Sequence, residues 1–495
     1  MTVYLVGAGP GDPGLITVRG AEVLARADVV VYDRLSVASL LDLVPPEAER
    51  ISVGKTPGRA SRPQAEINAL LVERGKAGEE VVRLKGGDPF LFARGGEEVA
   101  ALRAAGVAFE IVPGITSAMA VPAYAGIPVT HRGLASSFTV VTGQEGEAGV
   151  PVDWEAIARV GGTVAVLMGV AKREEIARRL MAGGLPADTP VAAVTWGTRP
   201  EQRTCRTTLG RLAGEAIESP AVMLVGAVAA LDLSWYEDRP LFGRRIVVTR
   251  AREQASDLVE RLHELGAATV ELPVIEIGEP ADGGAALREA ARRVGDYDWV
   301  AFTSANAVTR FFAALGEVGS DTRALGGRRV AAIGPGTADA LAGAGVRADL
   351  VPERFVAESL LDGFPDGPGR VLLPRAAVAR DALPAGLGEK GWAVDVVEAY
   401  RTAVGRPAPE ALAAAGRADA VTFTSSSTVA NYLAVAGDLP VAPVVACIGP
   451  ITADTARAAG LHVDVVAAEH TIEGLVGALV EAFGPDGRTD SDRGG

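Results

Sequence analysis

Three loops in the first half of the chain place glycine beside a carboxylate or a hydroxyl, each directly after a short apolar run. They are VGAGPGDP (residues 6–13), LKGGDPF (84–90) and PGITSA (113–118). Glycine permits tight turns and a close approach of the backbone to a ligand. Main-chain N–H groups, a carboxylate and hydroxyls could then hold that ligand. Because ligands of open α/β sheets collect at the carboxyl ends of strands, the loops predict one small-molecule site.

The first loop can be compared with the dinucleotide-binding pattern G-x-G-x-x-G, and the match is poor. Its glycines stand at alternate positions, two prolines interrupt them, and only Asp33 could act as the acidic residue after a second strand. A nicotinamide cofactor is therefore disfavoured. Taken singly, each of the three loops also fits an ordinary turn glycine or helix cap, so only their combination points to a ligand.

The elements that would position these loops alternate along the whole chain, which is typical of an α/β fold. In the first third, the expected strands are Val3–Val6, Val29–Tyr32, Val81–Leu84 and Phe109–Val112, and the expected helices are Thr17–Ala27, Gln64–Lys76 and Glu97–Ala105. A second set of such units covers residues 138–233. Residues 234–243 are polar, contain proline and glycine, and predict a linker. The tail, 483–495, is rich in glycine, aspartate and arginine after Phe483, has nothing to bury there, and predicts disorder.

The second half contains an internal repeat. FTSANAV (302–308) recurs as FTSSSTV (423–429), and IGPGTADA (333–340) recurs as IGPITADT (448–455). The repeat predicts two similar α/β lobes with matching loops across a cleft, although a duplication without a binding role fits it as well. We expect Thr337 and Thr452 to be N-cap residues of helices. The hydroxyl side chains of residues 303–304 and 424–426 are expected to cap helices in the same way. Helix N-termini hold anions through free N–H groups, but capping alone would also explain these hydroxyls.

The composition argues against several classes of protein. Lys and Arg number 48 against 62 Asp and Glu, a net charge of −14, which disfavours a nucleic-acid partner but allows an anionic small molecule in a locally basic pocket. Two cysteines and four histidines supply no disulfide framework and no dedicated metal site. The N-terminus lacks the basic segment of a signal peptide, and the longest apolar run, Ala221–Leu231, is too short for a bilayer. We therefore expect a cytoplasmic protein without a membrane partner.

Together, the motifs of residues 1–233 resemble the uroporphyrinogen-III C-methyltransferases, which are tetrapyrrole methylases built from two α/β subdomains. The resemblance rests on GAGPGDP, VYDRL, VGKTPG, VRLKGGDPF, PGITSA, AYAGIPVTHRG, LMG and WGT, in this order. It implies S-adenosylmethionine as cofactor and a homodimer formed through this half. The family's cofactor contacts fall on Pro10, Gly86, Gly87, Asp88, Leu91, Thr116, Ser117, Met168 and Gly197. Its proton acceptor falls on Asp33 and its proton donor on Lys55.

This resemblance implies methyl transfer to a pyrrole carbon of uroporphyrinogen III. The carbon is electron-rich and the sulfonium methyl is already activated, so the protein mainly aligns the two and excludes water. A base such as Asp33 would assist the loss of a proton from the methylated macrocycle. Basic side chains would bind the eight carboxylates of the substrate. Each of these basic side chains could equally be a solvated charge on the surface. The candidates are Arg19, Arg34, Lys55, Arg59, Arg62, Arg94 and Arg132.

Residues 244–482 resemble uroporphyrinogen-III synthase. The resemblance rests on IVVTRA, DWVAFTSANAV, VAAIGPGTADAL, VLLPRA, EAYRT and ACIGPITADTA. It implies two lobes, about 244–273 plus 402–482 and 274–401, and it places the family's candidate catalytic groups on Tyr400 and Thr452. The phenol of Tyr400 could donate a proton to the departing hydroxyl of hydroxymethylbilane, whereas a tyrosine at a strand end is often only packing.

The two resemblances predict a bifunctional enzyme of tetrapyrrole biosynthesis. The second half would cyclise hydroxymethylbilane to uroporphyrinogen III with inversion of the last pyrrole. The first half would then methylate that product twice to give precorrin-2. The alternative is a methylase of a later precorrin joined to a two-lobed module that binds a tetrapyrrole without catalysis.

Overall fold

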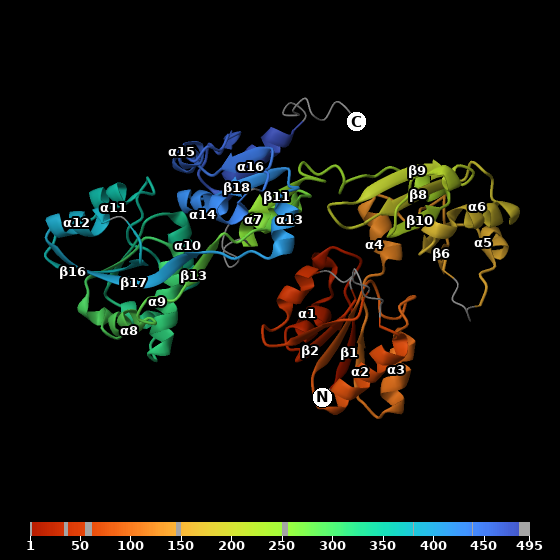
Figure 1. Ribbon diagram of the computed structural model, residues 1–495, viewed down its shortest axis with the longest axis horizontal. Coiled ribbons are helices and arrows are strands. Elements are labelled where there is room, and N and C mark those ends of the chain that lie inside the picture. The colour runs from red at the N-terminus through yellow and green to blue at the C-terminus, as the bar shows by residue number, and fades with distance from the viewer. Residues whose placement is uncertain are drawn as a thin grey trace. The chain divides into compact units, whose positions relative to one another are not determined.

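The computed structural model describes residues 2–33, 38–54, 62–144, 150–249, 256–379, 381–437 and 439–484. Within these residues the chain forms four five-stranded sheets with helices between the strands (Figure 1). The expected α/β fold class is therefore confirmed. The chain divides into two compact units, Met1–Arg245 with Arg261–Ala268 and Val480–Gly495, and Ile246–Glu260 with Thr269–Leu479. None of the described helices is long and apolar enough to cross a membrane.

The first sheet of the first unit is parallel and carries the glycine loops. Its order is β3-β2-β4-β1-β5, with β1 (Val3–Gly7), β2 (Val29–Tyr32), β3 (Glu49–Ser52), β4 (Val81–Lys85) and β5 (Phe109–Val112). The helices between these strands are α1 (Val18–Leu24), α2 (Gln64–Lys76) and α3 (Gly95–Ala104). Strands β1 and β4 are buried along their whole length, which is typical of a parallel sheet covered on both faces. Because parallel strands end at one edge, the loops after β1, β4 and β5 share that edge.

The second sheet of the first unit is mixed. Its order is β6-β7-β10-β8-β9, with β6 (Phe138–Thr142), β7 (Thr163–Leu167), β8 (Pro190–Thr195), β9 (Arg203–Thr208) and β10 (Ala221–Val225). Helix α4 (Ser117–Tyr124) precedes this sheet, and α5 (Trp154–Val160) and α6 (Arg173–Ala182) belong to it. In the segment expected to be a linker, Tyr236 and Leu241 are buried, and Tyr236 packs against Tyr124.

The second unit contains two further sheets. The first has the order β12-β11-β18-β19-β20 and the second the order β13-β17-β16-β14-β15. Their strands are β11 (Arg245–Val248), β12 (Ala268–Glu271), β13 (Ile275–Gly278), β14 (Trp299–Phe302), β15 (Arg329–Ala332), β16 (Gly369–Ala376), β17 (Trp392–Val404), β18 (Ala420–Phe423), β19 (Val444–Cys447) and β20 (Val465–Val466). The chain enters the second sheet at β13 and leaves it along β17.

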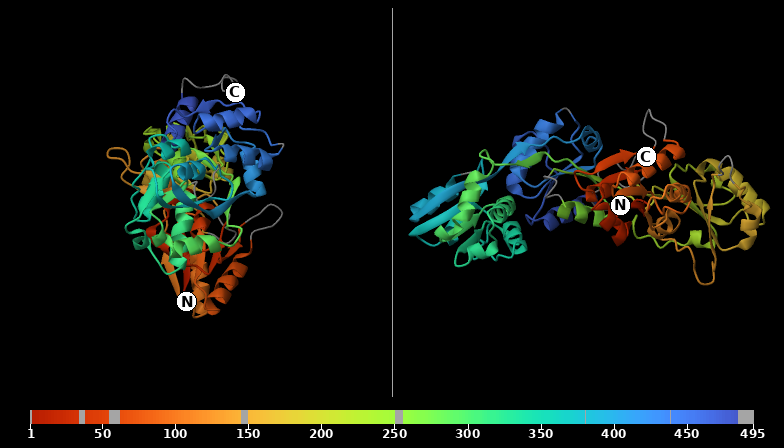
Figure 2. Two further views of the ribbon diagram at one scale, coloured as in Figure 1. Left: turned by 90° about the vertical axis from the view of Figure 1, so that its left-hand side faces the viewer. Right: turned by 90° about the horizontal axis from the view of Figure 1, so that it is seen from below.

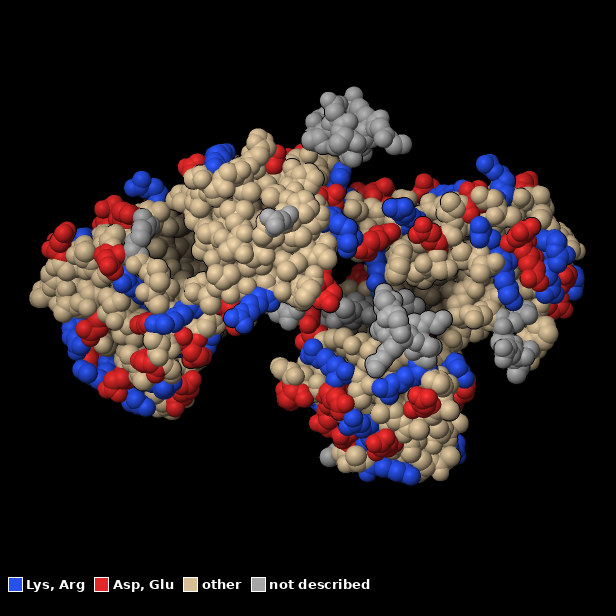
Figure 3. Space-filling model, in the orientation of Figure 1, with Lys and Arg blue, Asp and Glu red and all other residues tan. Residues whose placement is uncertain are grey.

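Helices cover both faces of the sheet that contains β17 (Figures 1 and 2). One face packs on α8 (Ala285–Arg292), α9 (Ala305–Glu317) and α10 (Pro335–Gly343), and the other on α11 (Ala357–Gly363) and α12 (Ala382–Glu389). The other sheet is accompanied by α7 (Ser256–Glu264), α13 (Pro409–Ala415), α14 (Ser426–Ala436), α15 (Pro450–Ala458) and α16 (Ile472–Phe483). In Figure 3, charged side chains gather over α8, whereas the face over α14 is largely uncharged. The tail was expected to begin at residue 483, but Phe483 is the last residue of α16. Residues from 485 onward lie outside the described ones.

Candidate functional site

The loops after β1, β4 and β5 contact one another through their backbones. The Gly87 N–H donates to the Gly9 carbonyl (2.7 Å), and the Gly9 N–H donates to the Gly87 carbonyl (3.3 Å). A Cβ atom added to Gly7 would lie 2.5 Å from the Gly114 Cα atom, so this crossing requires glycine. The three loops therefore form one continuous surface of main-chain groups, which we call the glycine cradle.

Asp88 braces the glycine cradle. Its Oδ1 accepts from the Phe90 N–H (2.8 Å), and its Oδ2 accepts from the Gly114 N–H (3.1 Å). The carboxylate thereby fixes the loop after β4 to the loop after β5. Beside it, Gly86 is exposed, and an added Cβ atom would meet nothing within 4 Å. A ligand could therefore lie directly against the backbone at Gly86, with the half-buried Leu91 in the following turn.

Helix α4 begins at the cradle. Thr116 is its N-cap, and the Thr116 Oγ1 accepts from the Ala118 N–H (3.2 Å). Ser117 is the first helical residue, and the exposed side chains of Ile115 and Met119 lie on either side of these two residues in the sequence. The hydroxyl of Thr116 is thus engaged in capping, while the start of the helix brings its N–H groups to the same edge of the sheet.

The second sheet contributes two loops with strained backbones. Met168, after β7, has φ of 54°, and Trp196 and Thr198, after β8, have φ of 50° and 69°. Positive φ is uncommon outside glycine, and such strain concentrates at functional sites. The Met168 side chain is 48 % exposed although it follows a buried strand. Gly197 lies between the two strained residues, and the Thr198 Oγ1 accepts from the Asp12 N–H (3.1 Å), so the loop after β8 touches the loop that contains Pro10.

Asp33 follows β2 and is held by a buried arginine. The Nη2 atom of Arg83 donates to both Oδ1 (3.0 Å) and Oδ2 (2.9 Å) of Asp33. The Arg83 side chain is 2 % exposed and that of Asp33 is 35 % exposed. Charge-assisted hydrogen bonds therefore fix the carboxylate on one side and leave another side accessible, as a proton acceptor requires. Lys55, the expected proton donor, lies outside the described residues.

A buried ion network behind Asp33 was missed by the sequence analysis. Glu98 of α3 is fully buried, and its Oε1 accepts from Arg83 Nε (3.1 Å), Lys85 Nζ (2.8 Å) and Gln64 Nε2 (3.2 Å). Burial, together with the nearby Arg83 guanidinium, lowers the pKa of Lys85. The signal was available in VVRLK, because a buried strand holds Arg and Lys only when carboxylates pair with them.

Two of the arginines considered for substrate carboxylates are already engaged in exposed ion pairs. Arg19 donates to Glu110 (2.9 and 3.0 Å), and Arg94 donates to Glu97 (2.8 Å). The remaining described candidates, Arg62 and Arg132, are exposed. The others, Arg34 and Arg59, lie outside the described residues.

In the second unit, serines cap the helices that follow β14 and β18. Ser304 is the N-cap of α9, and Ser425 is the N-cap of α14, so the expected caps at 303–304 and 424–426 are confirmed. The expectation for the two threonines is wrong. Thr337 and Thr452 lie in the first turns of α10 and α15, whose N-caps are glycines followed by proline at the first helical position. Proline is favoured there because its missing N–H is not needed, and both threonines are buried instead.

Tyr400 lies where the pairing of β16 with β17 becomes irregular. Its partner is Ala376, and the register shifts between Arg375 and Ala376. The Tyr400 hydroxyl donates to the Ser304 Oγ (3.1 Å), and the side chain is 8 % exposed. The structure thus brings the phenol to the start of α9. This contact connects two of the motifs named above, EAYRT and DWVAFTSANAV.

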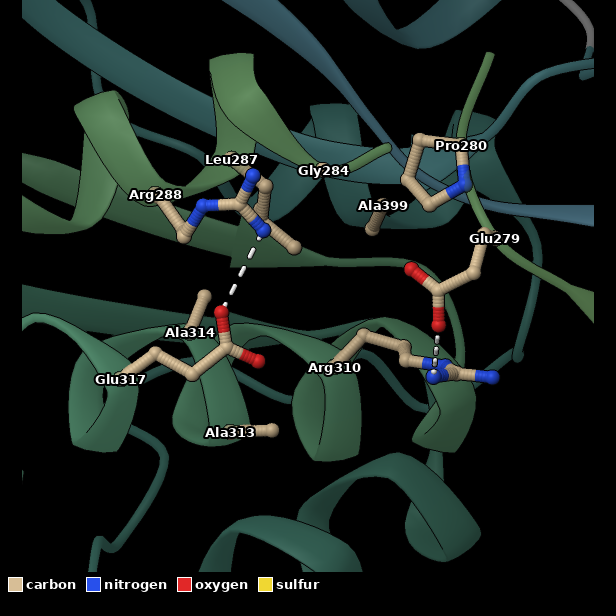
Figure 4. Close-up of a pocket in the computed structure, with 10 residues that line it drawn as sticks. All are labelled: Glu279, Pro280, Gly284, Leu287, Arg288, Arg310, Ala313, Ala314, Glu317 and Ala399. Carbon is tan, nitrogen blue, oxygen red and sulfur yellow. Dashed lines mark hydrogen bonds and ion pairs between the residues drawn. The ribbon is translucent and has the colours of Figure 1, made fainter. Parts of the chain in front are cut away.

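A small pocket in the same unit lies between α8 and α9 (Figure 4). Arg288 pairs with Glu317 (3.3 Å) and Arg310 pairs with Glu279 (2.9 Å) along its walls. Both guanidinium groups are thereby neutralised, and Ala399, rather than its neighbour Tyr400, lines the pocket. This pocket is therefore distinct from the group of side chains around Tyr400.

Two family models match the chain. Tetrapyrrole (Corrin/Porphyrin) Methylases matches residues 2–213, and Uroporphyrinogen-III synthase HemD matches residues 256–477. The porphyrin biosynthesis protein HemD of Ruminiclostridium josui is 40% identical over 97% of this chain and 98% of that protein. The chain belongs to this family of porphyrin biosynthesis proteins. It joins a C-methyltransferase domain to a uroporphyrinogen-III synthase domain, as the sequence predicted.

Two further relatives match the methyltransferase domain. The S-adenosyl-L-methionine-dependent uroporphyrinogen III methyltransferase of Methanosarcina barkeri is 50% identical over 46% of this chain and 92% of that protein. The uroporphyrin-III C-methyl transferase of Thermus thermophilus, solved with S-adenyl homocysteine, is 41% identical over 46% of this chain and 94% of that chain, with a TM-score of 0.41. The match to the tetrapyrrole methylase family and to the S-adenosyl-L-methionine-dependent relative agrees with the cofactor predicted from the sequence, which is S-adenosylmethionine.

The described residues fit this cofactor. The glycine cradle leaves open space at Gly86, the exposed Met168 offers an apolar thioether, and the strained loop around Gly197 touches the loop after β1. The cofactor would supply a methyl group activated by its sulfonium charge. The glycine cradle, the start of α4 and the two strained loops would supply the groups that bind and orient it.

Proposed function

We propose that this chain converts hydroxymethylbilane to uroporphyrinogen III and then methylates that product twice to give precorrin-2. The observation that supports the methyl transfer most directly is the oriented carboxylate of Asp33 in the same unit as the open glycine cradle. The cyclisation is supported by the contact of Tyr400 with Ser304 at the start of α9. The positions proposed for the cofactor contacts are Pro10, Gly86, Gly87, Asp88, Leu91, Thr116, Ser117, Met168 and Gly197.

In the methyl transfer, Asp33 would accept a proton that the macrocycle loses from another position once the ring carbon has been methylated, because the methylated carbon itself is fully substituted. Arg83 holds both carboxylate oxygens from one side, so proton transfer would take place on the accessible side. Lys55 would donate a proton elsewhere on the macrocycle. A positioned base typically contributes about 10²–10⁴-fold to the rate.

In the synthase reaction, Tyr400 would donate the proton that lets the hydroxyl of the bilane leave as water. Its hydroxyl already donates to Ser304 at a helix start, where free N–H groups also favour the carboxylates of an anionic substrate. Thr452, buried in the first turn of α15, would position that helix start rather than cap it.

The proposal includes a homodimer formed through the methyltransferase half, and a cytoplasmic location without a nucleic-acid or membrane partner. The net charge of −14 disfavours nucleic acid, and the free thiols of Cys205 and Cys447 suit a reducing compartment. Sedimentation of the purified chain tests the dimer.

A coupled assay tests the proposed function. The purified chain, given hydroxymethylbilane and S-adenosylmethionine, should consume two cofactor molecules per bilane and form a dimethylated product by mass. Methyl transfer only to an already methylated precorrin would favour the alternative methylase. Unmethylated product, with only the uninverted isomer I, would contradict both activities.

Gly86→Ala tests the placement of the cofactor. The added methyl group meets no protein atom within 4 Å, so the fold should be unaffected, but it would occupy space where the cofactor lies. Calorimetric affinity for S-adenosylhomocysteine should fall. Gly96→Ala, where an added Cβ atom also meets nothing within 4 Å, is the matched control and should bind normally.

A further inference from the structure

The segment between the two sequence families packs against the helix that begins at the glycine cradle. Tyr236 is 4 % exposed, and its ring centroid lies 4.9 Å from that of Tyr124, the last residue of α4. The Trp235 ring lies 5.1 Å from Tyr124, and the Trp235 Nε1–H donates to the Ala123 carbonyl (2.8 Å). Residues 235–236 therefore pack against the C-terminal end of α4 and are hydrogen-bonded to it.

Glu237 of the same segment begins a chain of hydrogen bonds. Its Oε1 accepts from Gln202 Nε2 (2.9 Å) and from Thr204 Oγ1 (2.5 Å). The Oε1 of Gln202, which is 2 % exposed, accepts from the Thr198 N–H (2.8 Å). A carboxylate only accepts and a backbone N–H only donates, so Glu237 fixes which end of the Gln202 amide faces Thr198.

Thr198 depends on this support because its φ of 69° is unfavourable for a β-branched residue. Its Oγ1 accepts from the Asp12 N–H (3.1 Å), and the Asp12 Oδ2 accepts from the Tyr124 hydroxyl (2.6 Å). A tyrosine hydroxyl is protonated at neutral pH, and burial and the hydrogen bond to Asp12 raise the pKa of Tyr124 further, so the hydroxyl acts as the donor. The chain of hydrogen bonds thus connects the loop after β8, the loop after β1 and α4.

We propose that Glu237 is a positioning residue for the cofactor site. Through Gln202 it holds Thr198, and thereby the loop that contains Gly197 and the loop that contains Pro10. This inference rests on the proposed function, which places cofactor contacts on those two loops. The segment 235–237 is then an integral part of the methyltransferase, although it lies beyond the residues matched by the methylase family model.

The test uses the full chain with Glu237→Ala. Affinity for S-adenosylhomocysteine should fall roughly tenfold, the size expected for losing a hydrogen bond to a charged group. The KM for S-adenosylmethionine should rise while kcat changes little, because Asp33 is untouched. Glu237→Gln keeps an acceptor for Gln202 and should restore most of the affinity. Asp238→Ala, at an exposed neighbouring position, should bind as the unaltered chain does.

Normal affinity in Glu237→Ala, with reduced affinity in Gly86→Ala, would overturn the inference and leave the proposed function standing. Normal affinity in both variants would instead contradict the proposed cofactor placement. If Glu237→Ala does not fold, Tyr124→Phe removes the donor to Asp12 and keeps the ring, and it should show the same loss of affinity. An unchanged affinity in Tyr124→Phe would then overturn the inference.

Discussion

The buried ion network makes Glu98→Gln the most informative single change in the methyltransferase unit. Glutamine keeps the shape and one acceptor oxygen of the side chain, and it replaces the negative charge with a neutral amide. Arg83 and Lys85, which are 2 % and 4 % exposed, then lose the carboxylate that pairs with both of them. Asp33 remains as a partly exposed partner of Arg83 alone.

The expected loss follows from the burial of these groups. Removing one partner of a buried ion pair typically costs about 3–5 kcal/mol, because an uncompensated charge stays behind. For a unit of roughly 150–250 residues, 1 kcal/mol corresponds to about 2–4 °C, so the unfolding temperature should fall by about 6–20 °C. Glu110→Gln breaks an exposed pair with Arg19 in the same unit and should cause a much smaller fall.

The loss should also depend on pH. Burial lowers the pKa of Lys85 below its ordinary 10.5, so between the lowered value and 10.5 the unfolded chain binds more protons than the folded one. The free energy of unfolding therefore rises with pH in that window. The Glu98 carboxylate raises the pKa of Lys85, so its removal extends the window downward. The loss of free energy of unfolding caused by Glu98→Gln should consequently become smaller as the pH is raised from about 7 to 10.

Scanning calorimetry of the full chain measures this effect. The transition of the methyltransferase unit is identified by its rise with S-adenosylhomocysteine, since a ligand stabilises the state that binds it. If Glu98→Gln lowers the unfolding temperature no more than Glu110→Gln does, Glu98 does not stabilise the buried charges of Arg83 and Lys85. If the loss of stability in Glu98→Gln grows between pH 7 and 10, Lys85 is not the group left unpaired.

Three further predictions concern the reactions and the glycine cradle. Asp33→Asn should lower kcat for methyl transfer by about 10²–10⁴-fold while calorimetric affinity for S-adenosylhomocysteine is kept. A kcat equal to that of the unaltered chain would show that Asp33 is not the base. Tyr400→Phe should lower synthase turnover by roughly 10²-fold, measured as bilane consumption; near-normal turnover would leave Tyr400 a packing residue. Gly114→Ala would place a Cβ atom within 2.3 Å of the Gly87 carbonyl oxygen, so it should lower both the unfolding temperature and cofactor affinity, and normal values for both would contradict the close packing.

The sequence predicted the strands of the first sheet well where they are continuous apolar runs, and β2 agrees at both ends. It did not predict β3 (Glu49–Ser52), because that edge strand is largely exposed and lacks the apolar pattern. The grouping of the glycine loops followed from the rule that parallel strands end at one edge. The roles of individual site residues and the domain boundaries stay predictions.

Other features depend on contacts that no local pattern encodes. Arg83 and Asp33 are 50 positions apart, and Glu237 and Gln202 are 35 apart, so their hydrogen bonds appear only when the strands and loops are assembled. The error at Thr452 has a local cause. Serine and threonine are preferred at N-caps, so the sequence favoured Thr452 as the cap of α15. The helix instead begins with a Gly-Pro pair, which places the cap three residues earlier, at Gly449.

The path of the chain through β13 and β17 makes one lobe of the synthase an insertion into the other. Ile275 pairs with Val404 across these antiparallel strands, and the Gly405 N–H donates to the Val274 carbonyl (2.9 Å). The points where the chain enters and leaves the inserted lobe therefore adjoin. Residues 275–404 contain every strand of their sheet and could be excised as a folding unit. The host lobe could then be resealed by a short turn, which would allow each lobe to be studied without the other.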